Sequence, residues 1–343
     1  MNWFQKIVQL FSTDLAMDLG TANTLLYARG EGIVINEPSV VALAKNSGKL
    51  LAIGGKAKAM YGKTPEQIDV IRPMKDGVIA DFDSTRKMID YFIKKAQGGR
   101  RMGFRPKIII GVPSGITQVE KRAVMDSATA AGAREVRLIE EPMAAAIGTG
   151  MPVGESCGNL IVDIGGGTTE VAIISMYATA YVESIRVAGD EMDEAIVRYL
   201  RQKHNLDIGV FEGERVKMTI GSAYPLERQI KMKVYGRDIV TGLPSSITLT
   251  NDDARLAIEE PIRAIFDAVR KALENTTPEF AHDISERGIV LAGGGSLIKG
   301  LGKALNAELN VPVYRAKDPL LAVARGAGVT LEEWETYKRV CIS

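Results

Sequence analysis

Short apolar runs alternate with segments of helical periodicity along the whole chain. The runs that predict buried strands are LAMD at 15–18, KIIIGVP at 107–113, VRLIEE at 136–141, NLIVDI at 159–164, EVAIIS at 170–175 and GIVLAG at 288–293. Helical patterns cover 84–96, 117–132 and 141–150, the last with Pro142 at its start and Gly148 near its end. Strands that alternate with helices in this way are typical of an α/β fold.

Two of these strands open segments that share one plan. DLAMDLGTANTLLYA at 14–28 and GNLIVDIGGGTTEVAII at 158–174 each consist of a strand, an Asp, a Gly-containing turn, a hydroxyl residue and a second strand. Strands joined by so short a turn predict a β-hairpin. Two unrelated hairpins that both use Gly and Asp are the alternative. The equivalent position of the Asp, and the Thr after Gly in both copies, favour an internal repeat.

The turns themselves indicate phosphate binding. Gly165, Gly166 and Gly167 allow close approach to the backbone, and Thr168 and Thr169 add donors. A carboxylate beside phosphate requires a cation between them, and Mg²⁺ is commonly held through carboxylates, water and phosphate oxygens. Asp18 and Asp163 are therefore predicted to hold Mg²⁺ through water, with one turn in each of two domains and the nucleotide in the cleft between them.

Two other segments resemble phosphate motifs less well. AKAMYGKT at 57–64 is a near miss to the P-loop, but Ala57 replaces the first Gly and Pro65 follows where a helix should continue. GGGSLIKGLG at 293–302 lacks the G-x-G-x-x-G spacing. It follows a predicted strand and opens a predicted helix, so a helix N-terminus near a ligand is plausible there.

The composition narrows the class of protein. The 343 residues are 46% hydrophobic and 25% charged, with a net charge of +1, which gives no overall field to attract nucleic acid. Only two cysteines, Cys157 and Cys341, are present, which argues against a disulfide framework and favours a reducing compartment. No apolar run approaches the roughly 20 residues that span a bilayer.

The first residues, MNWFQKIVQLF, predict a short amphipathic helix that lies on a membrane surface. Its apolar face comprises Trp3, Phe4, Ile7, Leu10 and Phe11. The alternative is a segment packed on its own domain. A second candidate is QGGRRMGFRPK at 97–107, where Met102 and Phe104 lie among arginines, as suits anionic lipid; a solvated loop is the alternative.

Six motifs in order make the chain resemble the actin and heat-shock-chaperone ATPase superfamily, and within it the bacterial actin-like cell-shape proteins. They are DLGTANT at 18–24, NEPSVVA at 36–42, IRPMKDGVIADF at 71–82, IEEPMAAAIG at 139–148, VDIGGGTTEVA at 162–172 and LAGGGSLIKGL at 291–301. The resemblance implies two ribonuclease H-like domains. The first core comprises 13–32, 76–150 and 315–343, with an insert at 33–75. The second comprises 151–188 and 251–314, with an insert at 189–250, and residues 1–12 precede both.

The resemblance also implies ATP or ADP with Mg²⁺, slow ATP hydrolysis coupled to filament formation, and attachment to the inner face of the cytoplasmic membrane. The implied partners are further copies of the chain and the cell-wall elongation machinery with its membrane-anchored adaptors, and the implied role is control of rod shape. The implied nucleotide-binding residues are Asp18, Gly20, Thr21, Ala22 and Asn23 in the first loop, Gly165, Gly166, Gly167 and Thr168 in the second, Gly293, Gly294, Gly295 and Ser296 beside the adenosine, and Glu214 and Lys217 at the base and ribose.

The resemblance places Glu141, the acid before Pro142, at the attacking water, with Thr168 as its hydrogen-bonding partner and Asp163 at the metal. Glu141 is expected to end a strand just before a helix. One of Glu140 and Glu141 is expected to be only a first-turn residue favoured by the helix dipole, and the residues alone do not decide which. A sugar kinase and a chaperone-type ATPase are the alternative functions. No second substrate site supports the first, and no substrate-binding domain follows the helical pattern around 331–340.

Overall fold

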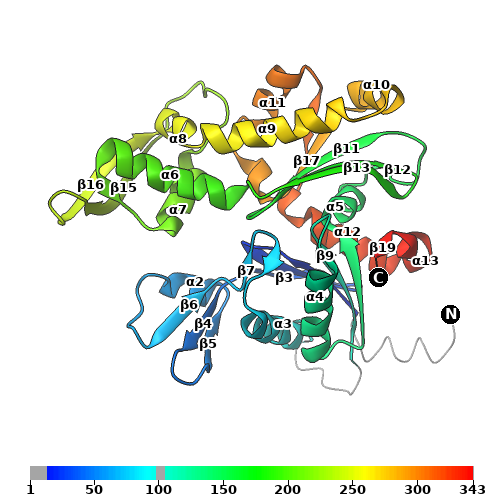
Figure 1. The fold of residues 1–343 in the computed structure, drawn as a ribbon, viewed down its shortest axis with the longest axis horizontal. Coiled ribbons are helices and arrows are strands. Elements are labelled where there is room, and N and C mark those ends of the chain that lie inside the picture. Colours follow the sequence, from blue (N-terminus) through cyan, green and yellow to red (C-terminus); the bar gives the residue numbers. More distant parts are fainter. Residues whose placement is uncertain (1–13, 98–104, 343) are drawn as a thin grey trace. The chain divides into compact units, whose positions relative to one another are not determined.

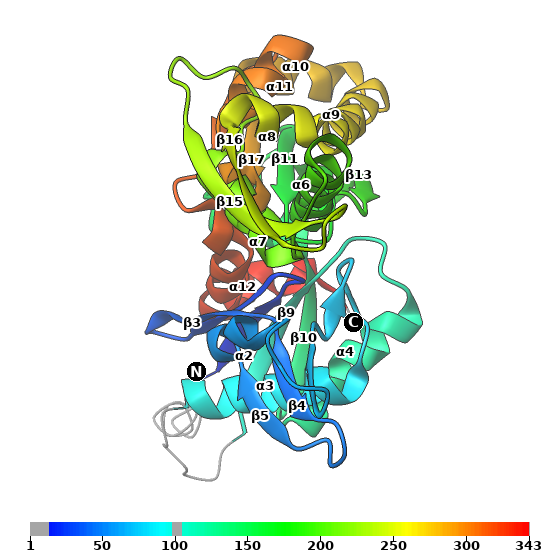
Figure 2. The ribbon, with the colours of Figure 1, turned by 90° about the vertical axis from the view of Figure 1, so that its left-hand side faces the viewer.

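The computed structural model describes residues 14–97 and 105–342. The chain forms two compact units. Unit 1 comprises residues 1–157, 174–180 and 320–343, and unit 2 comprises residues 158–173 and 181–319. Each unit is built around one large sheet (Figures 1 and 2). The finer division into cores and inserts stays a prediction.

The sheet of unit 1 has six strands in the order β3-β2-β1-β9-β10-β19. These are β1 (Leu15–Leu19), β2 (Asn23–Ala28), β3 (Gly32–Pro38), β9 (Lys107–Val112), β10 (Glu135–Glu140) and β19 (Cys341–Ile342). The first three form an antiparallel meander, and β9 and β10 continue the sheet parallel to β1. The strand at its far edge, β19, comes from the end of the chain and pairs antiparallel with β10.

Helices cover both faces of this sheet. Alternate strand residues such as Met17, Ile110 and Leu138 join the core formed with α3 (Phe82–Ala96) and α4 (Gln118–Ala130). The neighbouring positions face the other way, where Gly111 lies against α12 (Ala322–Glu332) and α5 (Glu141–Gly148). Asp81 and Thr117 cap α3 and α4, so α3 begins at Phe82, two residues before the predicted start, and α4 begins at Gln118, one residue after it.

Smaller elements complete unit 1. A three-stranded sheet in the order β5-β4-β6 contains β4 (Val41–Ala44), β5 (Leu50–Ile53) and β6 (Ile68–Ile71), with α2 (Gly55–Met60) beside it. A two-residue turn joins β7 (Met74–Lys75) to β8 (Val78–Ile79). The helix predicted around 331–340 is broken: α12 ends at Glu332, α13 covers Trp334–Tyr337, and the 3-10 helix η3 covers Lys338–Val340.

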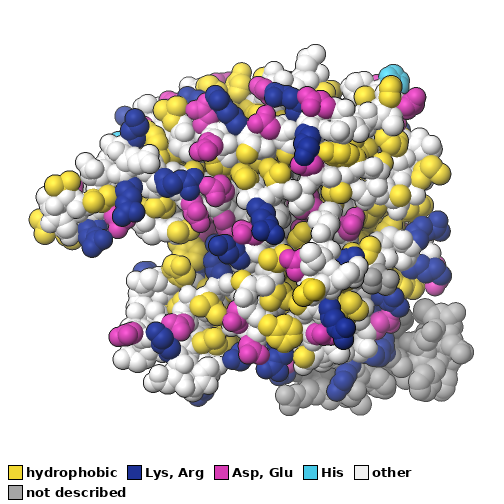
Figure 3. Space-filling view, viewed as in Figure 1, with side chains coloured by type: hydrophobic (Ala, Val, Ile, Leu, Met, Phe, Trp, Pro, Cys, Tyr) yellow, Lys and Arg dark blue, Asp and Glu magenta, His cyan; other side chains and the backbone are white. Residues whose placement is uncertain are grey.

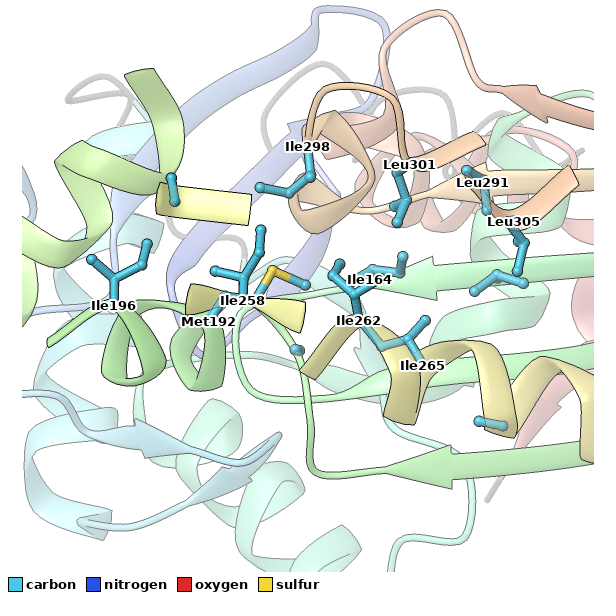
Figure 4. Close-up of a cluster of buried hydrophobic side chains, with 14 of the residues drawn as sticks. Ile164, Met192, Ile196, Ile258, Ile262, Ile265, Leu291, Ile298, Leu301 and Leu305 are labelled. Carbon is cyan, nitrogen blue, oxygen red and sulfur yellow. The ribbon is translucent and has the colours of Figure 1, made fainter. Parts of the chain in front are cut away.

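The sheet of unit 2 has the order β13-β12-β11-β17-β18. Its strands are β11 (Asn159–Ile164), β12 (Thr169–Ser175), β13 (Ala178–Ile185), β17 (Ile289–Ala292) and β18 (Val313–Arg315). Aliphatic side chains from β11 and β17 pack with those of α9 (Glu259–Glu274) and α11 (Leu301–Leu309), and α10 (Pro278–Arg287) lies beside β11. Figure 4 shows this core around Ile164, Ile262, Leu291 and Leu301.

The same core extends into the part of unit 2 that precedes α9. Met192 and Ile196 of α6 (Gly189–His204) join it (Figure 4). Helix α7 (Val210–Ile220) packs beside α6. A sheet in the order β14-β15-β16 follows, made of β14 (Leu206–Asp207), β15 (Lys231–Asp238) and β16 (Pro244–Thr250), and α8 (Asn251–Ala257) leads back to α9.

The two large sheets share their strand order, which confirms the internal repeat. The orders are β3-β2-β1-β9-β10 and β13-β12-β11-β17-β18. In each sheet, three strands that follow one another in the chain lie side by side. A fourth strand then pairs parallel with the first of these three, and a fifth pairs parallel with the fourth. The hairpins β1–β2 and β11–β12 occupy the same place in the two sheets. Both Asp–Gly turns therefore lie at equivalent positions of two copies of one fold.

The surface agrees with the near-zero net charge. On the face in Figure 3, lysines and arginines are interspersed with acidic side chains over both units. Among the described residues, no helix is long and apolar enough to cross a membrane.

Candidate functional site

The first turn of the repeat is held in shape by buried hydroxyl groups of unit 1. Ser39 Oγ donates a hydrogen bond of 2.6 Å to Gly20 O and lies 2.9 Å from Thr24 Oγ1. Thr21 is buried, and its hydroxyl accepts a 3.0 Å bond from Gly77 N–H in the β7–β8 turn. Asn23 bonds to Asn36 on β3. A Cβ at Gly20 would lie 2.6 Å from Asn23 O, so the turn requires Gly there.

Two carboxylates of unit 1 lie close to one glycine. Asp18 on β1 is in register with Gly111 on β9, and a Cβ at Gly111 would lie 3.6 Å from Glu141 Cγ. Burial raises the pKa of Asp18 from 3.8 to about 7, because a charged carboxylate is poorly solvated there. The fold thus places Asp18 on the strand beside Gly111 and Glu141 against the same glycine, although 123 positions separate the two acids in the chain.

The boundary between β10 and α5 corrects one expectation and separates the two adjacent acids. The strand ends at Glu140, and Glu141 is the first residue of α5, so Glu141 does not end a strand. Glu140 Oε2 accepts a 3.3 Å hydrogen bond from Thr179 Oγ1 on β13. Pro142 follows within the first helical turn and Gly148 ends the helix, as predicted.

The second turn is built between two strands of unit 2. Asp163, 5% exposed, is in register with Ala292 on β17. The turn closes through a 2.9 Å bond from Gly165 N–H to Thr168 O. A Cβ at Gly293 would lie 2.5 Å from Asp163 Oδ1, and one at Gly295 would lie 2.3 Å from Ile164 Cγ2. Gly293 and Gly295 therefore pack closely against Asp163 and Ile164, the two residues that precede the Gly165–Gly167 turn.

Two details of unit 2 differ from expectation. Thr169 is fully buried and its hydroxyl donates to Val187 O, between β13 and α6, at 2.7 Å, so this hydroxyl is used within the protein. Thr168 is 7% exposed. The segment after β17 does not open an α-helix. Gly294–Leu297 forms the 3-10 helix η1, in which Ser296 Oγ bonds to Gly293 O, and α11 begins only at Leu301. No α-helix N-terminus is present at Gly293–Ser296.

The residues predicted at the base and ribose lie on one helix, as their spacing indicates. Glu214 and Lys217 are on α7 and are partly buried. Lys217 Nζ forms an ion pair of 2.8 Å with Asp193 Oδ1 on α6 and donates to Gly189 O at 2.7 Å. Sequence reasoning missed Asp193, because DEMDEA reads as the acidic first turns of a solvated helix. Burial, the main cause, raises the pKa of Asp193 to about 7, partly opposed by Lys217.

Some predictions lie elsewhere. The membrane residues Trp3, Phe4, Ile7, Leu10, Phe11, Met102 and Phe104 lie outside the described residues. In the P-loop-like segment, α2 ends at Met60 and the next element is β6, so no helix follows Thr64, which agrees with the rejection of a P-loop on the basis of Pro65. The described residues contain no cluster of three or more His, Cys, Asp or Glu that fits a metal ion.

Two sheets of one plan, each with an Asp at the end of a central strand followed by a Gly-containing turn, define a protein of the actin-like fold. The model of the MreB/Mbl protein family matches residues 12–339, and the chain belongs to that family. It is thus an actin-like cytoskeletal protein of the cell-shape-determining class.

Similarity to named proteins and to solved structures agrees with this family assignment. The chain is 51% identical over 332 residues to the cell shape-determining protein MreB of Escherichia coli K12, with 96% of each chain covered. The crystal structure of MreB5 of Spiroplasma citri bound to ADP superposes with a TM-score of 0.90 at 36% identity, covering 96% of this chain and 98% of the other. The same protein bound to AMPPNP gives 0.89 at 36% identity over the same shares.

Proposed function

We propose that this protein binds ATP with Mg²⁺, forms filaments that are switched by slow ATP hydrolysis, and attaches to the inner face of the cytoplasmic membrane. The observation that carries the proposal is the tight turn at Gly165–Gly167, which follows the buried Asp163 and is closed by the bond from Gly165 N–H to Thr168 O, while Gly293 packs against Asp163 and Ile164. Three consecutive residues of this turn carry no Cβ, so a phosphate can approach their amide groups closely. The nucleotide-bound relatives support the same reading.

Each turn is proposed to contact nucleotide phosphates. Gly20, Thr21, Ala22 and Asn23 act in the first turn and Gly165, Gly166, Gly167 and Thr168 in the second. Gly293, Gly294, Gly295 and Ser296, together with Glu214, are proposed for the adenosine side. Lys217, which the resemblance places there too, is engaged instead by Asp193 and Gly189 O.

The carboxylates fit Mg²⁺ held through water. Mg²⁺ commonly keeps several waters and uses one or two carboxylates plus phosphate oxygens. Asp18 and Asp163 each lie one residue before the end of a central strand, next to a Gly-containing turn. When bound, the ion neutralises phosphate charge. Because ionisation of Asp18 is disfavoured by its burial, a cation near it would lower its pKa and restore the charged form.

Glu141 is the proposed water-positioning residue. It opens α5 close to Gly111 and Asp18, whereas the carboxylate of Glu140 accepts a bond from Thr179. Holding a water in line with the terminal phosphate is the main contribution that a side chain makes to phosphoryl transfer to water. Thr168, next to the second turn, is proposed as the second hydrogen-bonding partner of that water.

Self-assembly and membrane attachment follow from the family and the N-terminal pattern. A monomer whose first eleven residues insert only partly binds lipid weakly, and a filament that displays many copies binds strongly. Anionic lipid of the inner leaflet and the cell-wall elongation machinery with its adaptors are the proposed partners, and nucleic acid is not.

Sedimentation tests the proposal directly. The protein is incubated with ATP and Mg²⁺, with ADP and Mg²⁺, or with neither, and centrifuged. Pelleting that depends on ATP, with phosphate release, supports the filament function. A soluble protein that phosphorylates sugars would indicate the kinase alternative, and a soluble ATPase stimulated by unfolded peptide would indicate the chaperone alternative.

A further inference from the structure

Helices α6 and α7 of unit 2 approach each other closely at two glycines. A Cβ at Gly213 of α7 would lie 2.7 Å from Asp193 O on α6. A Cβ at Gly189, the first residue of α6, would lie 3.2 Å from both Gly165 O and Lys217 Nζ. Because residues four apart share one helix face, Gly189 and Asp193 on α6 meet Gly213 and Lys217 on α7. The two helices lie side by side in Figures 1 and 2.

A buried ion pair closes this contact. The side chains of Lys217 and Asp193 are 12% and 4% exposed, and their charged atoms are 2.8 Å apart. Lys217 also donates to Gly189 O at 2.7 Å. Two of the three N–H donors of the ammonium are thus used within the protein, and the carboxylate of Asp193 balances its charge. Lys217 is therefore not a free cation for phosphate.

The first residues of α6 bond to the second turn. Gly189 N–H donates to Gly165 O at 3.2 Å, and Asp190 N–H donates to Gly166 O at 2.7 Å. The described part of the chain has no cis peptide bonds, so each of these carbonyl groups is trans to the next N–H. Carbonyl groups that point towards α6 therefore turn the N–H groups of Gly166 and Gly167 away from α6.

We propose that Asp193 is a positioning residue for nucleotide binding: its ion pair with Lys217 fixes α6 against the second turn and so aims the Gly166 and Gly167 amides at the phosphates. This inference rests on the proposed function. It gives Lys217 a different task from direct contact with the base or ribose, and the two roles predict different measurements.

The first measurement is hydrogen–deuterium exchange without nucleotide, on peptides that cover 162–170 and 186–193. Asp193→Asn and Lys217→Met should each accelerate exchange in both peptides by about tenfold, the scale of losing a charged hydrogen bond. The control Arg198→Met removes exposed ion pairs with Glu191 and Glu194 on the same helix and should leave both peptides unchanged. If Asp193→Asn does not fold, the double variant Asp193→Leu with Lys217→Met is measured in its place, because it removes both charges and leaves neither one buried without its partner. Exchange as slow as in wild type in the folded single variants overturns the proposal.

The second measurement compares dissociation constants for ATP, GTP and 2′-deoxy-ATP, each with Mg²⁺. A positioning role predicts that Asp193→Asn and Lys217→Met weaken all three by a common factor of about ten, so that the ratios between ligands stay as in wild type. Selective loss among these ligands in Lys217→Met means direct contact with the base or ribose and overturns the proposal. If the wild-type protein binds none of the three, the proposed function fails, and the exchange experiment still decides whether the ion pair holds the turn.

Discussion

Gly148 and Gly326 meet where α5 crosses α12 in unit 1, and neither position has room for a side chain. A Cβ at Gly326 would lie 1.7 Å from Ala144 O, and one at Gly148 would lie 2.0 Å from Ala322 O. The crossing sets the position of α5, whose first residue is Glu141.

Gly326→Ala should therefore destabilise the protein by about 1–3 kcal/mol or more, because the methyl group overlaps backbone that cannot move alone. Urea unfolding followed by circular dichroism measures this. Gly209→Ala is the matched control, since it adds the same methyl group into open space at a φ of −77°. Equal midpoints for the two variants would show that the crossing relaxes easily.

Asp163→Ala should weaken nucleotide binding in a Mg²⁺-dependent way. The carboxylate is buried beside both Gly-rich segments of unit 2 and is the proposed anchor for Mg²⁺-bound water. Fluorescent ATP titrations with Mg²⁺ and with EDTA measure the effect. The variant should lose most of the gain that Mg²⁺ gives the wild type. An undiminished Mg²⁺ gain would remove the proposed role of Asp163.

Glu141→Ala should leave ATP binding in place and slow phosphate release by about 10²-fold or more, the scale of losing an acid–base or orienting group. Filaments of the variant should persist longer. Glu140→Ala is the matched control and should keep hydrolysis close to wild type, because Glu140 contacts Thr179. The reverse result would exchange the roles of the two acids.

Deleting residues 1–11, or replacing Phe4 and Ile7 with Asp, should reduce binding to anionic liposomes without reducing ATP-dependent sedimentation in solution. The change removes apolar area and adds charge of the same sign as the lipid. Flotation of monomer and polymer in parallel measures it, and wild-type polymer should float best. Residual flotation should disappear when Met102→Ser and Phe104→Ser are added. Full flotation after both changes would exclude both segments as anchors.

The nucleotide-free protein should lose stability as the pH rises from about 4 to about 7. Asp18 has a pKa of about 7 when folded and 3.8 when exposed, so in this window the folded state binds more protons than the unfolded state. This group lowers the unfolding free energy by up to about 1.4 kcal/mol per pH unit. Urea unfolding across this window should give a shallower slope for Asp18→Asn than for wild type. Parallel slopes would mean that Asp18 is ionised throughout.

The strands that were predicted from the sequence are those buried on both faces. NLIVDI and KIIIGV are nearly uninterrupted apolar runs because helices or chain cover both sides of their sheets. Strands β13 and β15 were not predicted, because exposed and more buried positions alternate along ATAYVESI and KMKVYGRD and both segments contain charged residues. Their pairing depends on neighbours far along the chain.

The residues of the candidate site also divide into those that a local sequence signal predicts and those that no local signal predicts. Asp18 and Asp163 were found because each ends an apolar run before a Gly turn, which is a local signal. The proximity of Glu141 to Gly111, and the pairing of Lys217 with Asp193, arise from packing between elements distant in sequence. No local pattern in the sequence predicts either contact.

Unit 1 begins and ends the chain, and this has a consequence for synthesis on the ribosome. Its helix α12 lies against β1 and β2, and its edge strand β19 pairs with β10, yet both elements come after residue 320. Unit 2 has all of its residues by Pro319. Domains commonly fold in the order in which they are translated. Here part of the sheet of unit 1 stays uncovered until the residues after 320 have been translated, whereas unit 2 has its full sequence once Pro319 has been translated.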